Sequence, residues 1–218
     1  MSSDLFYYLS GILIISLGIN FTINKFYCIN KIKLIIFTII SIFVGVLCSN
    51  VMNYIESGNF GGTSFYGAIF FMPIYVILFS FIFKVNLNKL LNLTAFLGMI
   101  TSMILKSRCF NYGCCGGRKI PIVTEHGYAV FPSQLAEAFF AFIVLIILII
   151  LFKKNKDRTD LYPMMMAIYG IGRLNLNTFR LYKSVFLFLA NGHIWSIVSI
   201  IIGFIWLFII YKKKKRTV

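Results

Sequence analysis

Charged residues are scarce in this chain of 218 residues, because Asp, Glu, Lys and Arg together make up only 12% of it. Hydrophobic residues account for 60%, and the mean hydropathy is +0.89, whereas soluble domains carry roughly 45–50% apolar residues. The composition therefore excludes an ordinary water-soluble globular protein. Among the charged residues the acidic ones are few, since there are six Asp and Glu against 21 Lys and Arg, which leaves a net charge of +15. In a soluble chain this balance would suggest nucleic-acid binding.

Long stretches without charge indicate helices that cross a membrane, because a transmembrane helix needs about 20 mostly apolar residues. Four uncharged stretches are long enough, and three shorter ones complete the set. No soluble domain, repeat or long low-complexity segment interrupts them. We therefore predict an all-α membrane protein, one polytopic domain over residues 1–218, with seven transmembrane helices at about 5–24, 34–54, 66–83, 90–105, 133–152, 162–174 and 193–211.

The basic residues predict the orientation of these spans. Fourteen of the 21 follow the first, third, fifth and seventh spans, and short cytoplasmic loops are enriched in Lys and Arg. The N-terminus has no basic residue, so we predict that it lies outside and that the C-terminus is cytoplasmic. It also lacks the positive region and the cleavage site of a signal peptide, which favours a permanent first helix. Basic runs that follow topology make nucleic-acid binding the least favoured function.

Seven basic residues fall on the predicted outer side, against the usual distribution: Lys106, Arg108, Arg118, Lys119, Arg173, Arg180 and Lys183. Such charges suggest a site for an anionic partner, for example a lipid phosphate, although Lys119 and Lys183 are interpreted as solvated loop charges. If the segment from Tyr169 onward is helical, its polar residues share one face: Tyr169, Arg173, Asn177 and Arg180. A guanidinium also offers a planar pair of donors to phosphate.

A glycine-containing outer loop holds three of the five cysteines: Cys109, Cys114 and Cys115. A zinc site would need two spaced pairs or a Cys/His set, and the nearest histidine, His126, lies eleven residues past Cys115. We therefore predict no metal site. An external disulfide is an open alternative. The adjacent residues Cys114 and Cys115 are poorly placed to pair with each other, so Cys109 would be the easier partner for either of them.

Two further segments carry candidate site residues. A glycine turn brings Tyr66 to the outer mouth of the third span, where an interfacial aromatic residue is the competing interpretation. Gln134 and Glu137 lie in the first turns of the fifth span, which Pro132 or Ser133 can begin. A carboxylate at this depth is costly unless it is paired, so we expect an outer Arg or Lys as the partner of Glu137.

The order and spacing of these motifs resemble the prolipoprotein diacylglyceryl transferase family. The resemblance covers about residues 58–180, and the span count extends it over the chain. It is carried by a Gly-Gly-x-Ser-x-x-Gly turn into the third span, an Arg/Gly/Cys-rich turn after the fourth, Pro-Ser-Gln-Leu-x-Glu at the start of the fifth, and Tyr-Gly-x-x-Arg followed seven residues later by Arg.

This resemblance implies an enzyme of lipoprotein maturation in the plasma membrane, with its active face on the outer side. Such a transferase moves the diacylglyceryl group of phosphatidylglycerol to the lipobox cysteine of a lipoprotein precursor and forms a thioether. The implied partners are phosphatidylglycerol, other membrane lipid and prolipoprotein signal peptides. The chemistry requires no cofactor, because the attacking thiolate belongs to the substrate.

The resemblance also assigns expected roles to individual residues. Tyr66, Tyr169 and Arg173 would be catalytic. The lipid headgroup would be bound by Lys106, Arg108, Arg173, Arg180, Asn177, Gln134 and Glu137. The chain departs from the family pattern where Tyr66 replaces a histidine, Asn177 and Cys114 replace glutamates, Cys109 replaces an asparagine and Lys106 replaces an arginine.

These departures keep two other hypotheses open. A tyrosine with a pKa near its ordinary value of about 10 is a poorer general base than histidine, which favours a lipid-binding protein of the same fold with reduced or re-purposed catalysis. The cysteine turn favours a membrane thiol or redox protein that uses Cys109, Cys114 and Cys115. Within it, Arg108 could lower the pKa of Cys109 or Cys114 and make that thiol nucleophilic.

Overall fold

Helices form most of the molecule. The computed structural model describes residues 3–58, 62–113, 117–124, 127–156, 158–180 and 191–216. In these residues the helices are α1 (Ser3–Tyr27), α2 (Lys31–Ser57), α3 (Phe65–Phe83), α4 (Leu87–Asn111), α5 (Ser133–Lys154), α6 (Leu161–Asn177) and α7 (Asn191–Arg216). Two antiparallel strands, β1 (Lys119–Thr124) and β2 (Gly127–Val130), form a hairpin between α4 and α5.

Local side chains explain where several helices begin and end. The side chain of Asn30 accepts a hydrogen bond from the backbone N–H of Ile32 at the start of α2. Asn86 caps α4 in the same way through the N–H groups of Asn88 and Lys89, as expected for asparagine at this position. At the end of α2, Gly58 adopts a left-handed conformation with φ of 70°, which glycine tolerates without steric cost.

Six of the helices are long and apolar enough to cross a membrane, namely α1 to α5 and α7. The chain is therefore a multi-pass membrane protein. Each of the seven spans expected from the sequence lies inside one helix. The helix at the sixth expected span, α6, has only 17 residues and is not one of the six. The count of seven spans and the outside position of the N-terminus stay predictions.

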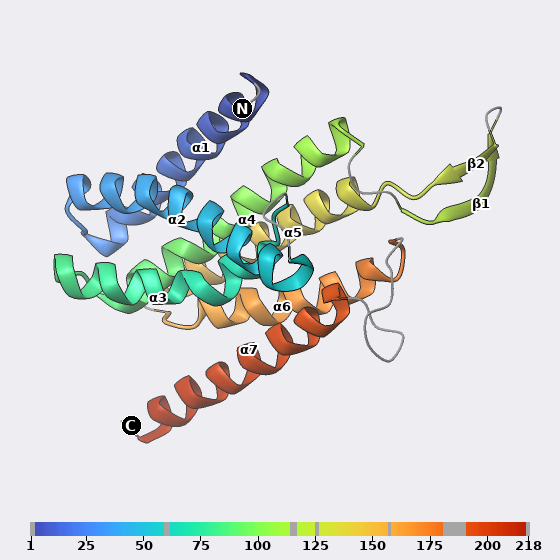
Figure 1. The fold of residues 1–218 in the computed structure, drawn as a ribbon. Coiled ribbons are helices and arrows are strands. Elements are labelled where there is room, and N and C mark those ends of the chain that lie inside the picture. The colour runs from blue at the N-terminus through green and yellow to red at the C-terminus, as the bar shows by residue number, and fades with distance from the viewer. Residues whose placement is uncertain are drawn as a thin grey trace.

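The hairpin was not expected, because the sequence analysis predicted helices alone. Lys119 pairs with Val130 and Thr124 with Gly127, and the ribbon extends well beyond the helices at one end of the bundle (Figure 1). The segment Ile120-Pro121-Ile122-Val123-Thr124 is rich in β-branched residues, which favour extended backbone. A helical bundle with one projecting hairpin is thus the corrected description of the fold.

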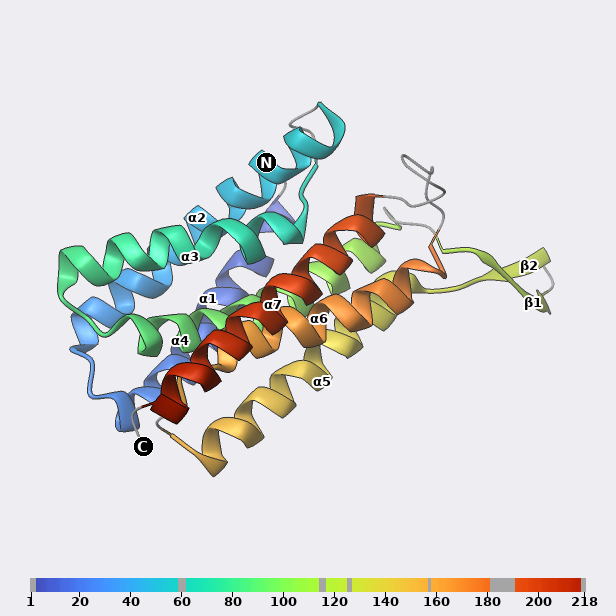
Figure 2. The same ribbon diagram turned by 90° about the horizontal axis from the view of Figure 1, so that it is seen from below.

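The centre of the bundle is α4, whose residues from Leu90 to Ile100 are buried on nearly every side of the helix. Helices α1, α3, α5 and α6 pack against α4, while α2 packs against α3 and α7 packs against α6 (Figure 2). Some of these contacts depend on glycine. A Cβ on Gly67 of α3 would overlap the backbone carbonyl of Cys48 in α2, and one on Gly203 of α7 would lie 2.9 Å from the carbonyl of Pro163.

At the end of the bundle where α5 ends and α6 begins, Arg158 and Tyr211 hold the carboxylate of Asp160. Arg158 donates through Nε and Nη2 at 2.8 Å, and the Tyr211 hydroxyl donates at 3.0 Å. Burial opposes ionisation of Asp160, but these donors outweigh it and hold the pKa of the carboxyl below its ordinary value. The contacts fasten the start of α6 to the end of α7.

We expect Gly67→Ala to destabilise the protein, because its methyl group would push α3 away from α2. Overpacking of this kind costs roughly 1–3 kcal/mol. The matched control is Gly18→Ala in α1, where an added Cβ meets nothing within 4 Å. Thermal unfolding in detergent should show a lower midpoint for Gly67→Ala alone. Equal midpoints for the two variants would show that the α2–α3 approach tolerates a side chain.

Candidate active site

Those expected site residues that the structure describes gather at one end of the bundle, which we call the site end. Here α2, α4 and α6 end, while α3, α5 and α7 begin. Neighbouring helices run in opposite directions, so their terminal turns meet although they are distant in sequence. The hairpin projects from this same end (Figures 1 and 2).

Arg180 reaches the site by a route that the sequence did not predict. The interpretation that Tyr169 to Arg180 form one helical face is wrong for its last member, because α6 ends at Asn177. The backbone then turns, and Arg180 forms an isolated antiparallel bridge with Gly117. A Cβ on Gly117 would overlap the backbone carbonyl of Phe131. Only glycine therefore lets the chain at position 117 pass this close to the segment that precedes α5.

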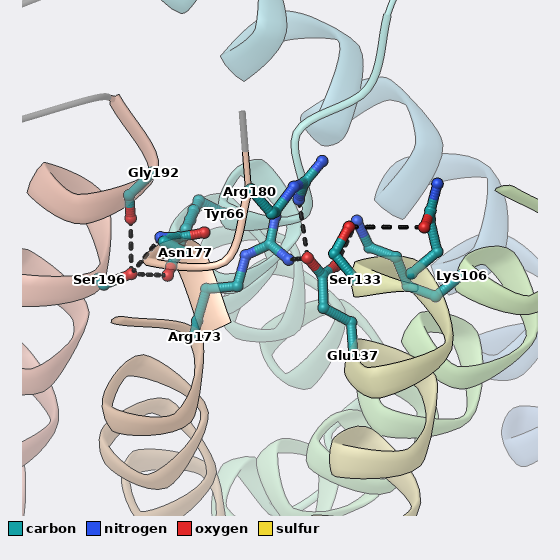
Figure 3. Close-up of polar contacts among 10 residues, drawn as sticks. Tyr66, Lys106, Ser133, Glu137, Arg173, Asn177, Arg180, Gly192 and Ser196 are labelled. Carbon is teal, nitrogen blue, oxygen red and sulfur yellow. Dashed lines mark hydrogen bonds and ion pairs between the residues drawn. The ribbon is translucent and has the colours of Figure 1, made fainter. Parts of the chain in front are cut away.

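Glu137 on α5 is the centre of a buried ionic cluster (Figure 3). Its Oε2 lies 2.7 Å from Nζ of Lys106, and its Oε1 lies 2.7 Å from Nη1 of Arg180 and also contacts Nη1 of Arg173. The expectation that Glu137 pairs with an Arg or Lys is therefore confirmed, by three different residues, while their position on the outer side stays a prediction. The side chain of Glu137 is only 3% exposed, so the carboxylate interacts with its partners at low local dielectric.

The cluster carries more positive than negative charge. One carboxylate faces the cations of Lys106, Arg173 and Arg180, whose side chains are 15%, 11% and 9% exposed. An excess of buried positive charge is costly unless an anion accompanies it. The geometry therefore provides a site that favours a negatively charged group, held by two guanidinium groups and one ammonium.

A cavity of about 810 Å³ opens beside this cluster. Lys106, Arg173 and Arg180 line it, whereas Glu137 does not. Away from the cationic cluster, the wall becomes largely apolar and is formed by residues of α1, α2, α3, α4 and α6: Ile12, Ile42, Ile69, Met72, Leu97 and Met165. From Arg173 to Tyr162 along α6, the wall spans about 16 Å at 1.5 Å per residue. A molecule with an anionic head and an apolar tail matches this distribution.

Tyr66 lies where α3, α6 and α7 meet, and its hydroxyl is hydrogen-bonded to Ser196. Its side chain is 4% exposed, and its hydroxyl oxygen lies 2.6 Å from Oγ of Ser196. Ser196 donates its single hydroxyl hydrogen to the carbonyl of Gly192 at 2.6 Å, so Tyr66 must donate to Ser196. Asn177 donates to the same oxygen at 3.4 Å (Figure 3). The hydroxyl proton of Tyr66 is therefore donated to Ser196 of α7.

The aromatic ring of Tyr169 completes the wall next to Arg173. It lines the cavity and packs edge-on against Phe65 and Tyr66, with centroid distances of 5.1 and 6.0 Å. Arg108 also lines the cavity, but it lies under aromatic rings rather than on Glu137, with its guanidinium 4.9 Å from the Tyr112 centroid. Both residues therefore border the space that a ligand would occupy.

The remaining expected residues are divided between buried, exposed and undescribed positions. Gln134 is buried, 6% exposed, beside Ser133 of its own helix turn. Lys119 is exposed, as expected for a solvated charge, but it is the first residue of β1 rather than part of a loop, and Arg118 is exposed as well. Cys109 lines the cavity. Cys114, Cys115 and Lys183 lie outside the described residues, so the disulfide and thiol hypotheses stay predictions.

Sequence reasoning missed two polar residues of the site. Ser196 sits in a long apolar helix, where a serine carries no distinguishing signal. Glu56 was not singled out from the sequence, but it lies in the last turn of α2 and lines the cavity. The sequence did offer a hint that Glu56 has a role. Acidic residues are rare in this chain, and this one stands between Asn53 and a glycine-containing turn.

Comparison with known families agrees with this arrangement. The sequence profile of the prolipoprotein diacylglyceryl transferases matches residues 5–209. The chain belongs to the prolipoprotein diacylglyceryl transferase family. No curated protein matches the chain in a separate comparison. The resemblance seen over residues 58–180 is thus confirmed and extends over almost the whole chain.

Membership of the prolipoprotein diacylglyceryl transferase family makes this chain a member of a transferase family of lipoprotein biosynthesis. The family acts on lipid and prolipoprotein substrates. The cavity, with a cationic end and an apolar depth, suits the first of these substrates. The roles of individual residues stay predictions, and they can be tested one by one.

We expect Glu137 and Arg180 to be strongly coupled in stability. Glu137→Gln leaves three cations without their counter-charge and should cost about 3–5 kcal/mol. Arg180→Met should be destabilising in the wild-type background, because it removes an ion pair. In the Glu137→Gln background the same change should be stabilising, because it removes an uncompensated charge.

A double-mutant cycle of unfolding midpoints in detergent measures this reversal, with an expected coupling of about 0.5–3 kcal/mol. Lys153→Met is the control, since Lys153 is exposed at the far end of α5, and its effect should be the same in both backgrounds. Additive effects of Glu137→Gln and Arg180→Met would contradict the central role of the Glu137 carboxylate.

Proposed function

We propose that this chain transfers a diacylglyceryl group from phosphatidylglycerol to the thiol of a lipobox cysteine in a lipoprotein precursor. The carrying observation is the cluster of Lys106, Arg173 and Arg180 at the charged end of a partly apolar cavity. Phosphatidylglycerol has one phosphate and two acyl chains, so it fits both parts of this space. Family membership supplies the reaction type.

The cationic residues act on the leaving group in this proposal. The substrate sulfur attacks the glyceryl carbon next to the phosphate, the carbon–oxygen bond breaks, and glycerol phosphate departs with the electron pair. Arg173 and Arg180 stabilise the negative charge that grows on the phosphate oxygens, and Lys106 adds a third positive charge. Donors fixed before the reaction are effective because they need not reorganise during it. Glu137 acts through these cations by holding them in place.

The proposed location is the plasma membrane, with the site end at its outer face. Basic residues support this orientation, because the far end of the bundle carries Lys25, Lys31, Lys33, Lys84, Lys89 and the Lys153–Lys154 pair. That pattern is typical of cytoplasmic loops. The thiol of a precursor that has crossed the membrane would then meet the lipid at the site end.

A second candidate function is lipid binding without turnover. The observation that favours it is the hydrogen bond from Tyr66 to Ser196, since Tyr66 stands where the family pattern has a histidine and its hydroxyl is occupied. A protein of this kind would bind phosphatidylglycerol at the same cationic cluster and leave a lipobox peptide unchanged.

We expect the wild-type protein in phosphatidylglycerol vesicles to add a diacylglyceryl group to a synthetic lipobox peptide, detected by the mass of the thioether product. Arg173→Ala should lower the rate by at least about 100-fold, the range for loss of one transition-state donor. It should still insert and unfold cooperatively. Lys153→Ala, which removes an exposed charge at the far end of α5, should keep the wild-type rate.

Two results would separate the alternatives. Tight binding of phosphatidylglycerol by a wild-type protein that forms no thioether would favour the lipid-binding function. Undiminished transfer by a folded Arg173→Ala variant would refute the assignment of the cationic cluster to the reaction.

A further inference from the structure

The proposed transfer requires a proton acceptor, because a thiol attacks carbon effectively only as its thiolate. Tyr66 is poorly suited, since it donates its own proton to Ser196. Glu137 is also unsuited, because three cations surround its carboxylate and it does not line the cavity. The base has to be another group that faces the space where substrate binds.

Glu56 is a carboxylate that does line this cavity. It belongs to the last turn of α2 and is partly buried. Ser64 donates a hydrogen bond from its hydroxyl to Oε1 of Glu56 at 2.8 Å. Ser64 immediately precedes α3 and lines the cavity as well. The carboxylate is thus oriented by a residue from the next helix rather than extended into solvent.

The backbone of Glu56 is fixed from a second direction. Asn191, the first residue of α7, donates from its side-chain amide to the Glu56 carbonyl at 3.2 Å. The end of α2 is therefore tied to the starts of both α3 and α7. Such support from separate elements keeps a reacting group within the small tolerance that catalysis requires.

Glu56 also lies close to the cation that would receive the phosphate. Arg173 is near enough to act on the Glu56 carboxylate through its charge, and both side chains line the cavity. A thiol that attacks the glyceryl carbon of a lipid held by Arg173 would therefore arrive between the leaving phosphate and the Glu56 carboxylate. A base must come within hydrogen-bond reach of the proton that it removes, and the position of Glu56 in the cavity wall is compatible with that requirement.

We propose that Glu56 is a catalytic residue and serves as the general base of the transfer reaction. Its carboxylate accepts the proton of the substrate thiol while the sulfur–carbon bond forms and the carbon–oxygen bond breaks. The electron pair of the broken bond leaves with glycerol phosphate. The proton on Glu56 then passes to water or to the departing phosphate, which restores the carboxylate. This inference rests on the proposed function and adds the residue that activates the acceptor.

The test compares Glu56→Gln with the wild-type protein in the lipobox-peptide assay. Removing a general base lowers the rate by roughly 10²–10⁴-fold, so kcat should fall by at least about 100-fold. The KM for phosphatidylglycerol should stay within about twofold, because Glu56 does not hold the lipid. Ser64→Ala keeps the carboxylate and loses one hydrogen bond, so its kcat should fall far less.

A peptide with selenocysteine in place of the lipobox cysteine separates a base from a structural residue. Its selenol is already ionised at neutral pH and needs no base. Glu56→Gln should therefore regain most of the wild-type rate with this peptide. Arg173→Ala should remain slow with both peptides, since its defect concerns the lipid and not the thiol.

The outcomes distinguish the inference from the function on which it rests. Wild-type transfer together with an unchanged kcat for Glu56→Gln would overturn the inference alone. An equal loss of rate with cysteine and selenocysteine peptides would also overturn it, because the carboxylate would then have only a structural role. If the wild-type protein modified neither the cysteine peptide nor the selenocysteine peptide, the proposed function and the inference would be overturned together.

Discussion

One carboxylate organises the site end of this protein. Glu137 on α5 contacts Lys106 from α4, Arg173 from α6 and Arg180 from the segment after α6, so three otherwise separate parts of the chain meet at its two oxygen atoms. The carboxylate positions these cations without neutralising them, because three positive charges share one negative charge. The proposed binding of an anionic headgroup therefore depends on the same contacts that hold the bundle together at this end.

The sequence predicted the features that depend on composition and on short-range pattern. Each expected span lies within a helix, and the basic residues that departed from the usual distribution include the three that meet at Glu137. The need of a buried carboxylate for a cation was enough to predict a partner for Glu137. Those inferences rest on the cost of placing charge in an apolar environment, which does not depend on the details of packing.

Features that depend on long-range geometry escaped prediction. Helical periodicity could place Arg173 and Asn177 on one face, but Arg180 reaches the cluster through a backbone bridge to Gly117. Nothing local connects Ser196 to Tyr66, which is 130 residues away. Glu56 and Glu137 look alike in sequence, and only the fold reveals that one lines the cavity while the other lies behind its cations. The surroundings of each carboxylate, rather than its type, decide what it can do.

The short length of α6 has a consequence for the depth at which lipid would meet the protein. Its 17 residues rise about 26 Å, whereas the hydrocarbon core of a bilayer is about 30 Å thick. A helix of this length that starts at one surface ends before it reaches the other. In an α6 that starts at the membrane surface, Arg173 would lie about 18 Å along the helix axis and so short of the opposite headgroup layer. A phospholipid whose phosphate reached Arg173 at that depth would keep its tails in their own leaflet. The water-soluble part of an acceptor peptide would then have to descend to the lipid.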